Sequence, residues 1–193
     1  MLNVANHPPK TSDKSGSVFE LVRFALIAIA IVVPIRLFVA QPFIVSGASM
    51  VPTFSHGEYL IVDEFSYRFE KPERGDVIIF SYPRDPSKYF IKRIIGLPGE
   101  TLEIKGKNII IKNKIHPKGF SLEEPYVESQ TFGERIYFLN EDEYFVLGDN
   151  RPASSDSRSW GPLPEKYIKG KPFLRLLPIQ RITVFPGDYS FSQ

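Results

Sequence analysis

The chain has 193 residues, 24 Lys and Arg against 22 Asp and Glu, a formal net charge of +2 and no cysteine. Its length accommodates one domain of ordinary size plus an appendage, and its 42% hydrophobic and 24% charged residues exclude a disordered chain and a protein with many membrane spans. The small net charge gives no support for nucleic-acid binding, and the lack of cysteine excludes disulfides, thiol nucleophiles and thiolate metal sites, so covalent catalysis requires an oxygen or an amine.

The N-terminal part predicts a tail followed by a membrane anchor. Residues 1–17 are polar, contain Pro and Gly and have almost nothing to bury, which is typical of a mobile tail. Residues 18–41 are strongly apolar, and their charge-free core at 24–35 is only twelve residues long. Residues 21–40 reach the ~20 that a spanning helix needs when Arg23 and Arg36 extend to opposite interfaces.

A cleaved secretory signal is the alternative for this apolar segment. The small residues of a cleavage site are missing at Phe38-Val39-Ala40, and the suitable Ser46-Gly47-Ala48 lies well past the apolar core. A retained anchor is therefore favoured. Because the cations Lys10, Lys14 and Arg23 precede the span, the positive-inside rule predicts a single-pass protein with a cytoplasmic N-terminus and an extracytoplasmic domain.

Residues 42–193 predict a mainly β domain, a barrel or a sandwich of short antiparallel strands. Runs of β-branched and aromatic residues bounded by turn residues predict strands at 59–62, 77–80, 89–95, 109–111, 136–139, 144–147, 173–177 and 182–185. Residues 102–111 predict a hairpin around Gly106. The polar, turn-rich stretch 113–133 predicts a small excursion away from the core.

The three histidines, His7, His56 and His116, favour surface positions. None has a His or acidic partner at the spacing of zinc ligands, and none stands in a setting typical of a Ser-His-Asp triad. The sequence also lacks a phosphate-binding loop and a dinucleotide fingerprint. We therefore expect no metal and no cofactor.

Three polar segments are candidates for chemistry. The first, SGASMVPTF at 46–54, closely follows the anchor, and its small residues and Pro52 predict a turn that exposes Ser49. The amide of Ser49 would be available to a developing oxyanion. Taken alone, this segment is better interpreted as a linker.

The second segment, YFIKRIIGLPGE at 89–100, predicts a strand. Alternation places Lys92 on one face with Phe90, and Arg93 on the other face with Ile91. An edge-strand lysine that reaches water is the usual interpretation. The alternative is a desolvated lysine, whose pKa would fall by roughly 2–3 units from ~10.4, which would cost about 3–4 kcal/mol and leave free amine near neutral pH. Such an amine can act as a general base toward a serine.

The third segment, GDNRPASSDSRSWG at 148–161, has no apolar pattern. A solvated loop is the simple interpretation. Since Asp156 and Arg158 closely bracket Ser157, an Ω-type loop held by its own hydrogen bonds is the alternative, and functional residues often lie on such loops.

In this order behind an N-terminal anchor, the three segments resemble the conserved boxes of type I signal peptidases. These are membrane-bound serine endopeptidases that use a Ser-Lys pair to remove signal peptides from exported proteins. The resemblance covers the chain from the anchor to about Gly161. It implies a signal-peptidase-like β domain, with the extra domain of larger members reduced to the excursion at 113–133.

The resemblance implies a role for each matching residue. Ser49 corresponds to the nucleophile, Lys92 to the general base, and Ser154 to the hydroxyl that orients the lysine. Gly47 stands where some members have a serine in the oxyanion hole, so this chain would rely on backbone amides, chiefly that of Ser49. The residues implied as loop supports are Asp149, Arg151, Asp156 and Arg158, the last two as an ion pair.

The substrates implied by the resemblance are preproteins whose signal peptides end in small residues of the Ala-x-Ala type. Shallow pockets for such residues need bulky walls, and the candidates that lie near Ser49 or Lys92 in the sequence are Val45, Met50, Phe54, Phe90 and Ile91. The other expected partner is the lipid bilayer, because the short link between anchor and Ser49 holds the site at its surface and raises the effective substrate concentration.

Three alternatives differ in class or substrate. One is a specialised Ser-Lys processing peptidase of pilus or conjugation systems, which only its substrates would distinguish. A soluble self-cleaving repressor is disfavoured by the anchor and by the lack of a DNA-binding element. A membrane-anchored peptide-binding β domain with a decayed site is disfavoured because Ser49, Lys92 and Ser154 are all intact.

Overall fold

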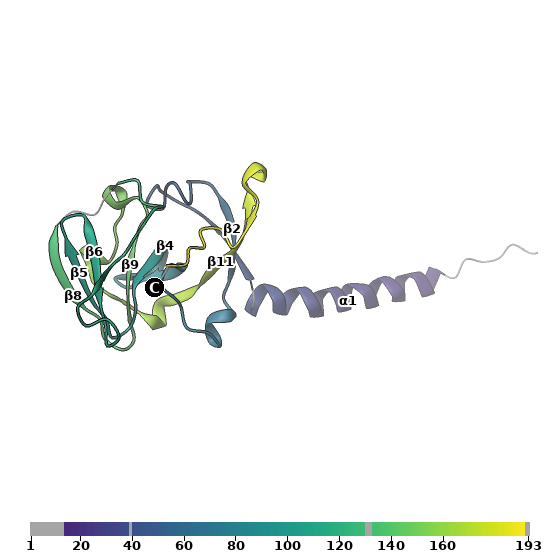
Figure 1. Cartoon of the computed structure of the whole chain (residues 1–193). Helices are drawn as coiled ribbons and strands as arrows, with labels where there is room; N and C mark the ends of the chain where they lie inside the picture. Colours follow the sequence, from purple (N-terminus) through teal and green to yellow (C-terminus); the bar gives the residue numbers. More distant parts are fainter. Residues whose placement is uncertain (1–13, 39, 130–132, 192–193) are drawn as a thin grey trace, which may run out of the picture. The chain divides into compact units, whose positions relative to one another are not determined.

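The computed structural model describes residues 14–38, 40–129 and 133–191 (Figure 1). The chain divides into two units after Phe38, and each unit is described by itself. Most of the predicted tail lies outside the described residues. The first unit contains helix α1 (Lys14–Phe38), which begins before residue 18 and ends before residue 41 because Ala40 already pairs with Asp63 in a sheet.

The helix α1 is rich in exposed apolar side chains. From Val18 to Val33 the large apolar side chains whose exposure is described are mostly exposed. When length and hydropathy are considered together, no helix among residues 14–38, 40–129 and 133–191 qualifies as a membrane-crossing helix.

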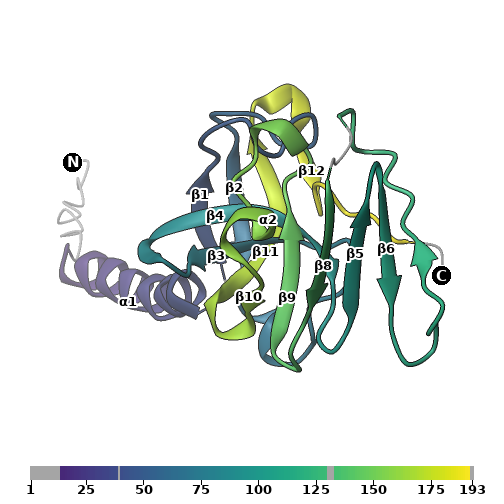
Figure 2. The same ribbon diagram turned by 90° about the vertical axis from the view of Figure 1, so that its left-hand side faces the viewer.

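The second unit consists mainly of two antiparallel sheets, which lie side by side (Figures 1 and 2). The larger sheet has the order β1-β2-β11-β3-β4-β9-β10, with β12 paired to β11. Its strands are β1 (Ala40–Ile44), β2 (Tyr59–Asp63), β3 (Val77–Tyr82), β4 (Asp85–Gly96), β9 (Glu143–Leu147), β10 (Leu163–Pro164), β11 (Ile168–Leu177) and β12 (Thr183–Val184). The smaller sheet, in the order β7-β6-β5-β8, contains β5 (Thr101–Lys105), β6 (Asn108–Lys112), β7 (Phe120–Ser121) and β8 (Glu134–Phe138).

Each predicted strand segment overlaps an observed strand, and the hairpin around Gly106 is confirmed as β5 and β6. Two strands are longer than the short ones that we predicted. β4 has 12 residues, and β11 has 10 residues and pairs with β2, β3 and β12 through register shifts. The short helices among the described residues are η1 (Ser66–Arg68), η2 (Arg151–Ala153), α2 (Ser157–Trp160), η3 (Glu165–Tyr167) and η4 (Ile179–Arg181).

The core consists of three buried clusters, and β4 contributes to two of them. Ile94 packs in a cluster with Phe80 and Val146, whereas Ile95 packs in another with Leu102 and the smaller sheet. The third cluster contains Val45, Met50, Phe54, Leu60 and Val77. Because β4 is buried on both faces at its C-terminal half, any polar side chain there must find partners inside the protein.

The predicted excursion at 113–133 is wrong for its middle part. Phe120 and Ser121 form β7 against β6, and Leu122 is buried in the cluster of the smaller sheet, with its amide donating to Ile109. The ring of Tyr126 lies 4.1 Å from the guanidinium carbon of Arg93. Turn residues dominate this stretch, but its few apolar side chains carry it back to the core.

Candidate active site

Ser49 lies on a tight turn between β1 and β2. The amide of Val51 donates to the carbonyl of Ala48 at 3.2 Å, and that of Phe54 donates to Met50 at 2.8 Å. Met50 and Phe54 are 1% and 0% exposed and fix the turn in the third core cluster. The turn therefore leaves Ser49 partly exposed, while Met50 and Phe54 are buried.

The loop at 148–161 holds the Ser49 turn from the other side. The amide of Asn150 donates to the carbonyl of Ser49 at 3.0 Å, and its side-chain amide donates to Ala48 at 3.1 Å. No described residue accepts a hydrogen bond from the backbone N–H of Ser49. The N–H of Gly47 donates to Nδ1 of His56 at 3.3 Å. Of the two candidate oxyanion donors, the Gly47 amide therefore already has an acceptor, and the Ser49 amide has none among the described residues.

Lys92 projects from β4 toward this turn. Its side chain is 4% exposed, and Nζ lies 2.8 Å from Ser49 Oγ and 2.8 Å from the carbonyl oxygen of Ile91. The ring of Phe90 lies 5.5 Å from the amine. Lys92 is therefore a buried lysine, and the edge-strand interpretation is wrong because β4 is an inner strand between β3 and β9.

Burial sets the charge state of Lys92. Desolvation is the largest influence and lowers the pKa of Lys92 to about 8, while the negative charges of Asp156 and Asp149 act in the opposite direction. No carboxylate forms a hydrogen bond with this amine among the described residues. A substantial fraction of Lys92 is thus uncharged near neutral pH, and a free amine can accept the proton of a hydroxyl 2.8 Å away.

The loop at 148–161 is held by Asp156. Its carboxylate pairs with the guanidinium of Arg158 at 2.8 Å and accepts the amide of Gly148 at 3.2 Å. It also caps the N-terminus of α2 by accepting the amide of Arg158. The guanidinium of Arg158 further donates to the carbonyl of Arg151 at 2.6 Å, so this loop is ordered by its own polar contacts.

Ser154 differs from the expectation. Its hydroxyl is buried and has no hydrogen-bond partner among the described residues, so it does not bond to Lys92. Its Oγ lies against the backbone of Gly148, in the space that a Cβ on that residue would occupy. The second partner of the lysine amine is instead the carbonyl of Ile91.

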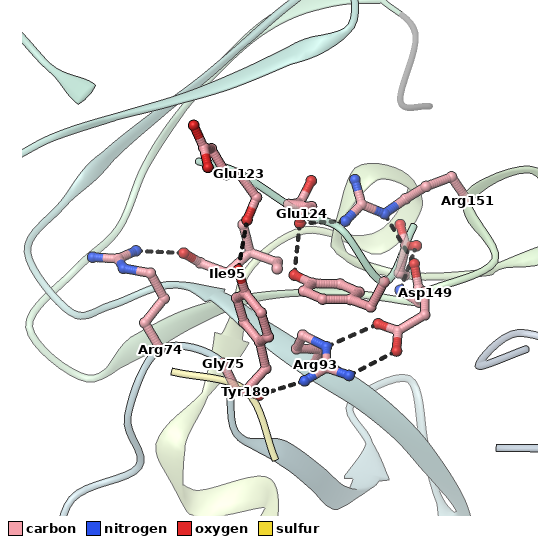
Figure 3. A network of polar contacts seen from close by, with 12 residues as sticks. Arg74, Gly75, Arg93, Ile95, Glu123, Glu124, Asp149, Arg151 and Tyr189 are labelled. Carbon is pink, nitrogen blue, oxygen red and sulfur yellow. Dashed lines mark hydrogen bonds and ion pairs between the residues drawn. The ribbon is translucent and has the colours of Figure 1, made fainter. Parts of the chain in front are cut away.

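Arg93, the residue after Lys92, is the centre of a buried network that we did not anticipate (Figure 3). Its guanidinium donates from Nε and Nη2 to the two carboxylate oxygens of Asp149 at 3.0 and 2.8 Å, and both side chains are 1% exposed. Asp149 also accepts the hydroxyl of Thr53 at 2.5 Å. The network joins the Lys92 strand, the loop and the Ser49 turn. No local sequence pattern indicated it, because its contacts join segments that are far apart in the chain.

The network extends through Tyr126, whose ring lies 4.1 Å from the guanidinium carbon of Arg93, to Glu124 and Arg151. Figure 3 shows Glu124 and Arg151 close to Asp149 and Arg93. The hydroxyl of Tyr126 donates to Glu124 at 2.9 Å, and the guanidinium of Arg151 pairs with the same carboxylate at 2.5 Å. Arg151 also donates to the carbonyl of Gly148 at 3.0 Å. Asp149 therefore contacts Arg93 and Thr53 outside the loop, and Arg151 contacts both Glu124 outside it and Gly148 within it.

A cavity of about 280 Å³ opens beside Ser49 and Lys92. Val45, Phe90 and Ile91 line it as expected, together with Phe43, Leu60, Ile79 and Tyr89. Met50 and Phe54 do not, which corrects our expectation. Both point into the third core cluster, because adjacency to Ser49 in sequence does not fix the direction of a side chain on a tight turn.

The described residues contain no group of three or more His, Cys, Asp or Glu that could hold a metal ion. His56 is exposed, and the ring of His116 packs edge-on against Phe120 at 5.1 Å. Neither approaches the arrangement of a Ser-His-Asp triad in the contacts of the described residues.

Comparison with known proteins agrees with this geometry. The model of the family "Signal peptidase, peptidase S26" matches residues 18–177. A probable signal peptidase I-2 of Synechocystis sp. is 34% identical over 93% of this chain and 82% of its own length, and a signal peptidase I of Leptolyngbya laminosa is 35% identical over 91% and 88%. A signal peptidase I of Bacillus licheniformis is 32% identical over 90% and 96%.

A solved structure of a signal peptidase I from Enterococcus faecalis V583 covers 53% of this chain and 97% of its own chain, with 33% identity and a TM-score of 0.46. The family match spans both the Ser49 turn and the 148–161 loop. The chain belongs to the signal peptidase family, peptidase S26, and to its signal peptidase I enzymes.

Proposed function

We propose that Ser49 is the nucleophile and Lys92 the general base of a membrane-anchored signal peptidase that cleaves exported preproteins after small residues. The observation that supports this most strongly is the 2.8 Å separation of Lys92 Nζ and Ser49 Oγ, with the lysine side chain only 4% exposed. Membership of the signal peptidase I enzymes supplies the reaction, which is hydrolysis of the peptide bond that joins a signal peptide to its preprotein.

In the first half of the reaction, uncharged Lys92 takes the proton of Ser49 as Oγ attacks the scissile carbonyl carbon. The carbonyl oxygen becomes an oxyanion, and the free backbone N–H of Ser49 is a suitable donor to it. Each such donor contributes roughly 3–4 kcal/mol in studied serine proteases. The Gly47 amide would first have to leave His56 to contribute.

When the tetrahedral intermediate collapses, the C–N bond breaks and the lysine ammonium gives its proton to the leaving amine. The signal peptide then remains as an ester on Ser49. In the second half, the regenerated amine of Lys92 takes a proton from a water molecule, whose hydroxide attacks the ester carbon. The bond between that carbon and Ser49 Oγ then breaks, the signal peptide leaves as a carboxylic acid, and the lysine ammonium returns its proton to Oγ. One proton carrier thus serves both halves, which suits a site without a histidine in contact with the serine.

The small cavity beside the Ser49–Lys92 pair supports selection of small residues. At about 280 Å³ and shared among the positions before the cleaved bond, it admits residues such as alanine, while the rings of Phe90 and Tyr89 would contact larger ones. Phe43 and Tyr89 pack edge-on at 5.4 Å and narrow the cavity from opposite strands.

Location at the plasma membrane is part of the same proposal, with α1 as anchor and the Ser49–Lys92 pair on the extracytoplasmic face. The exposed apolar side chains of α1 need an apolar environment, which a bilayer provides. Two tethered molecules meet at a raised effective concentration, so a membrane-bound enzyme suits a membrane-bound preprotein.

The test is cleavage of a purified preprotein with an Ala-x-Ala site by the full chain in detergent. We expect Ser49→Ala and Lys92→Ala each to lower kcat/KM by at least about 10⁴-fold, as for other catalytic pairs that act as a unit. Matched controls are Ser87→Ala and Lys88→Ala on the same β4 strand, where Lys88 is 66% exposed, and both should cleave normally. Cleavage by Ser49→Ala at a comparable rate would refute the proposal.

A further inference from the structure

The segment at 186–191 lies beyond the family match at 18–177 and packs against the Arg93 network. We call it the C-terminal strap. It follows β12 and contains no helix or strand, yet Pro186 is buried and Gly187, Tyr189 and Phe191 are partly buried. A segment without regular structure that is nevertheless buried needs specific contacts, and three sets of contacts hold it.

The first contact is a hydrogen bond to Arg93. The guanidinium Nη1 donates to the carbonyl oxygen of Gly187 at 2.7 Å and to that of Gly75 at 2.8 Å. With the two bonds to Asp149, four of the five N–H donors of Arg93 are satisfied. This guanidinium is almost completely buried, so water cannot satisfy its N–H groups. The carbonyl of Gly187 in the strap provides an acceptor in place of water.

The second contact is with the Ser49 turn. A Cβ placed on Gly187 would lie 2.8 Å from the ring of Phe54 and 3.0 Å from the methyl group of Thr53. The strap backbone therefore lies directly against the turn that carries Ser49. Through Gly187 alone, the strap touches both the neighbour of Lys92 and the turn of Ser49.

The third contact is an aromatic cluster that anchors the end of the strap. The ring of Tyr189 lies 5.1 Å from Tyr126 and 4.9 Å from Phe191, both edge-on, and Tyr126 in turn covers Arg93 (Figure 3). Gly75 leaves no room between itself and the strap, since a Cβ there would lie 2.0 Å from the carbonyl oxygen of Tyr189. Phe191 reaches the core cluster of the smaller sheet.

We infer that the C-terminal strap is a positioning element for the Ser49–Lys92 pair, which it aligns by fixing Arg93 and the Ser49 turn against each other. This inference rests on the proposed catalytic roles of Ser49 and Lys92. The strap touches neither reacting group in the contacts of the described residues; it acts through Arg93, Asp149 and Thr53.

Loss of the strap would change Lys92 in a predictable direction. The charges that act on the lysine amine are the carboxylates of Asp156 and Asp149, both from the loop, and Arg93 neutralises Asp149. Without the strap, the guanidinium of Arg93 becomes exposed to solvent, and its ion pair with Asp149 weakens. Entry of solvent reduces the desolvation of Lys92, and the carboxylate of Asp149 is less neutralised by Arg93. Both changes raise the pKa of Lys92 toward its ordinary value. Less free amine then remains at pH 7.

The sharpest variant is Gly75→Ala, whose methyl group displaces the strap without changing the strap sequence. Its matched control is Gly106→Ala, which also has positive φ but open space around the new methyl group. With the full chain in detergent, we expect Gly75→Ala to lower kcat about tenfold at pH 7 with KM changed less than about twofold, and to move the acidic limb of the pH profile to higher pH by about half a unit or more. Gly106→Ala should match the wild type.

A second variant ends the chain after Pro186, and its control ends after Phe191. The same kcat loss and the same shift of the pH profile are expected for the first only. Wild-type kcat with an unshifted profile in a folded variant would overturn the inference, and so would a loss of activity that follows the folded fraction alone. If the shortened chain does not fold, Gly75→Ala decides by the same two readouts.

The inference and the proposed function fail differently. The protonation midpoint of Lys92 can be measured without turnover, from the ¹³Cε shift of labelled lysine assigned with Lys92→Met. Wild-type protein without Ser49-dependent cleavage would refute the proposed function. An unchanged Lys92 midpoint in Gly75→Ala would refute the positioning role of the strap, whether or not the wild type cleaves preproteins.

Discussion

The two faces of β4 each bury a basic side chain, but only the side chain on the Arg93 face has a carboxylate partner among the described residues. Lys92 and Arg93 are neighbours, 4% and 1% exposed, and their side chains point to opposite faces of the strand. Within the described part of the chain, the hydrogen-bond partners of the Lys92 amine are a hydroxyl and a carbonyl oxygen. The guanidinium of Arg93 contacts both oxygens of a carboxylate and two carbonyl oxygens.

The partners explain the difference in charge state. Burial alone disfavours the charged form of both side chains, but the hydrogen bonds and charge of Asp149 outweigh burial and raise the pKa of Arg93, whereas the pKa of Lys92 falls to about 8. A guanidinium keeps its proton, and the bidentate carboxylate of Asp149 supplies the countercharge that its burial requires. The amine of Lys92 can lose its proton, and its burial without a carboxylate partner among the described residues makes it a base.

The largest expected effect on kcat/KM comes from replacing Lys92 with arginine, a cation that cannot lose its proton. Lys92→Arg should lower kcat/KM on an Ala-x-Ala preprotein by at least about 10⁴-fold, because a guanidinium does not deprotonate at any usable pH. The control is Lys88→Arg on the exposed end of β4, which should cleave normally. Substantial turnover by Lys92→Arg at pH 8 would mean that another group is the base.

The next effect comes from removing the partner on the Arg93 side. Asp149→Asn leaves a buried guanidinium without its countercharge, and we expect a loss of about 3–5 kcal/mol in the free energy of unfolding. Chemical denaturation of the full chain in detergent measures it. Asp85→Asn is the control, because Asp85 forms an exposed ion pair with Lys88 and its loss should change stability little. Equal effects of the two variants would contradict a structural role for the buried pair.

On the Lys92 face, we expect a substitution to increase the free energy of unfolding, not to decrease it. Lys92→Met should increase the free energy of unfolding by about 1–3 kcal/mol near pH 7, since it removes a buried amine whose charged form is disfavoured. Between about pH 8 and 10.5 the unfolded lysine binds more protons than the folded one, so wild-type stability rises with pH and the advantage of Met shrinks. A clear destabilisation by Lys92→Met at pH 7 would count against desolvation of the amine.

The sequence predicted local structure better than it predicted partners. Alternating apolar residues located the strands, and their two-residue period correctly put Lys92 and Arg93 on opposite faces. The same period could not tell that both faces are buried, because that depends on the smaller sheet on one face and on residues such as Trp160 and Tyr167 in the cluster of the other face. The pairing of Arg93 with Asp149 spans 56 residues, and its bond to Gly187 spans 94. No local pattern encodes such contacts.

Direction on turns was also beyond the sequence. Met50 and Phe54 flank Ser49 closely, but they turn into the core, while Phe43 and Tyr89 line the cavity from more distant positions. Ser154 shows the same limit, since its hydroxyl lies against the backbone of Gly148 and has no hydrogen-bond partner among the described residues. The positions of these residues were recognisable from the resemblance, but their rotamers depend on packing between segments that are far apart in sequence.

The smallest expected effect is the pH dependence of kcat/KM of the unmodified enzyme. It distinguishes Lys92, whose charge changes with pH, from Arg93, whose charge does not. With the pKa of Lys92 at about 8, the free-amine fraction grows about fivefold between pH 7 and 8 and less than about twofold above pH 8.5. The rate kcat/KM should follow it, while Arg93 stays charged throughout. Initial rates at constant ionic strength from pH 6 to 10, with thermal melts to verify folding, measure this. A kcat/KM that stays constant between pH 7 and 8 would mean that Lys92 is not the titrating base.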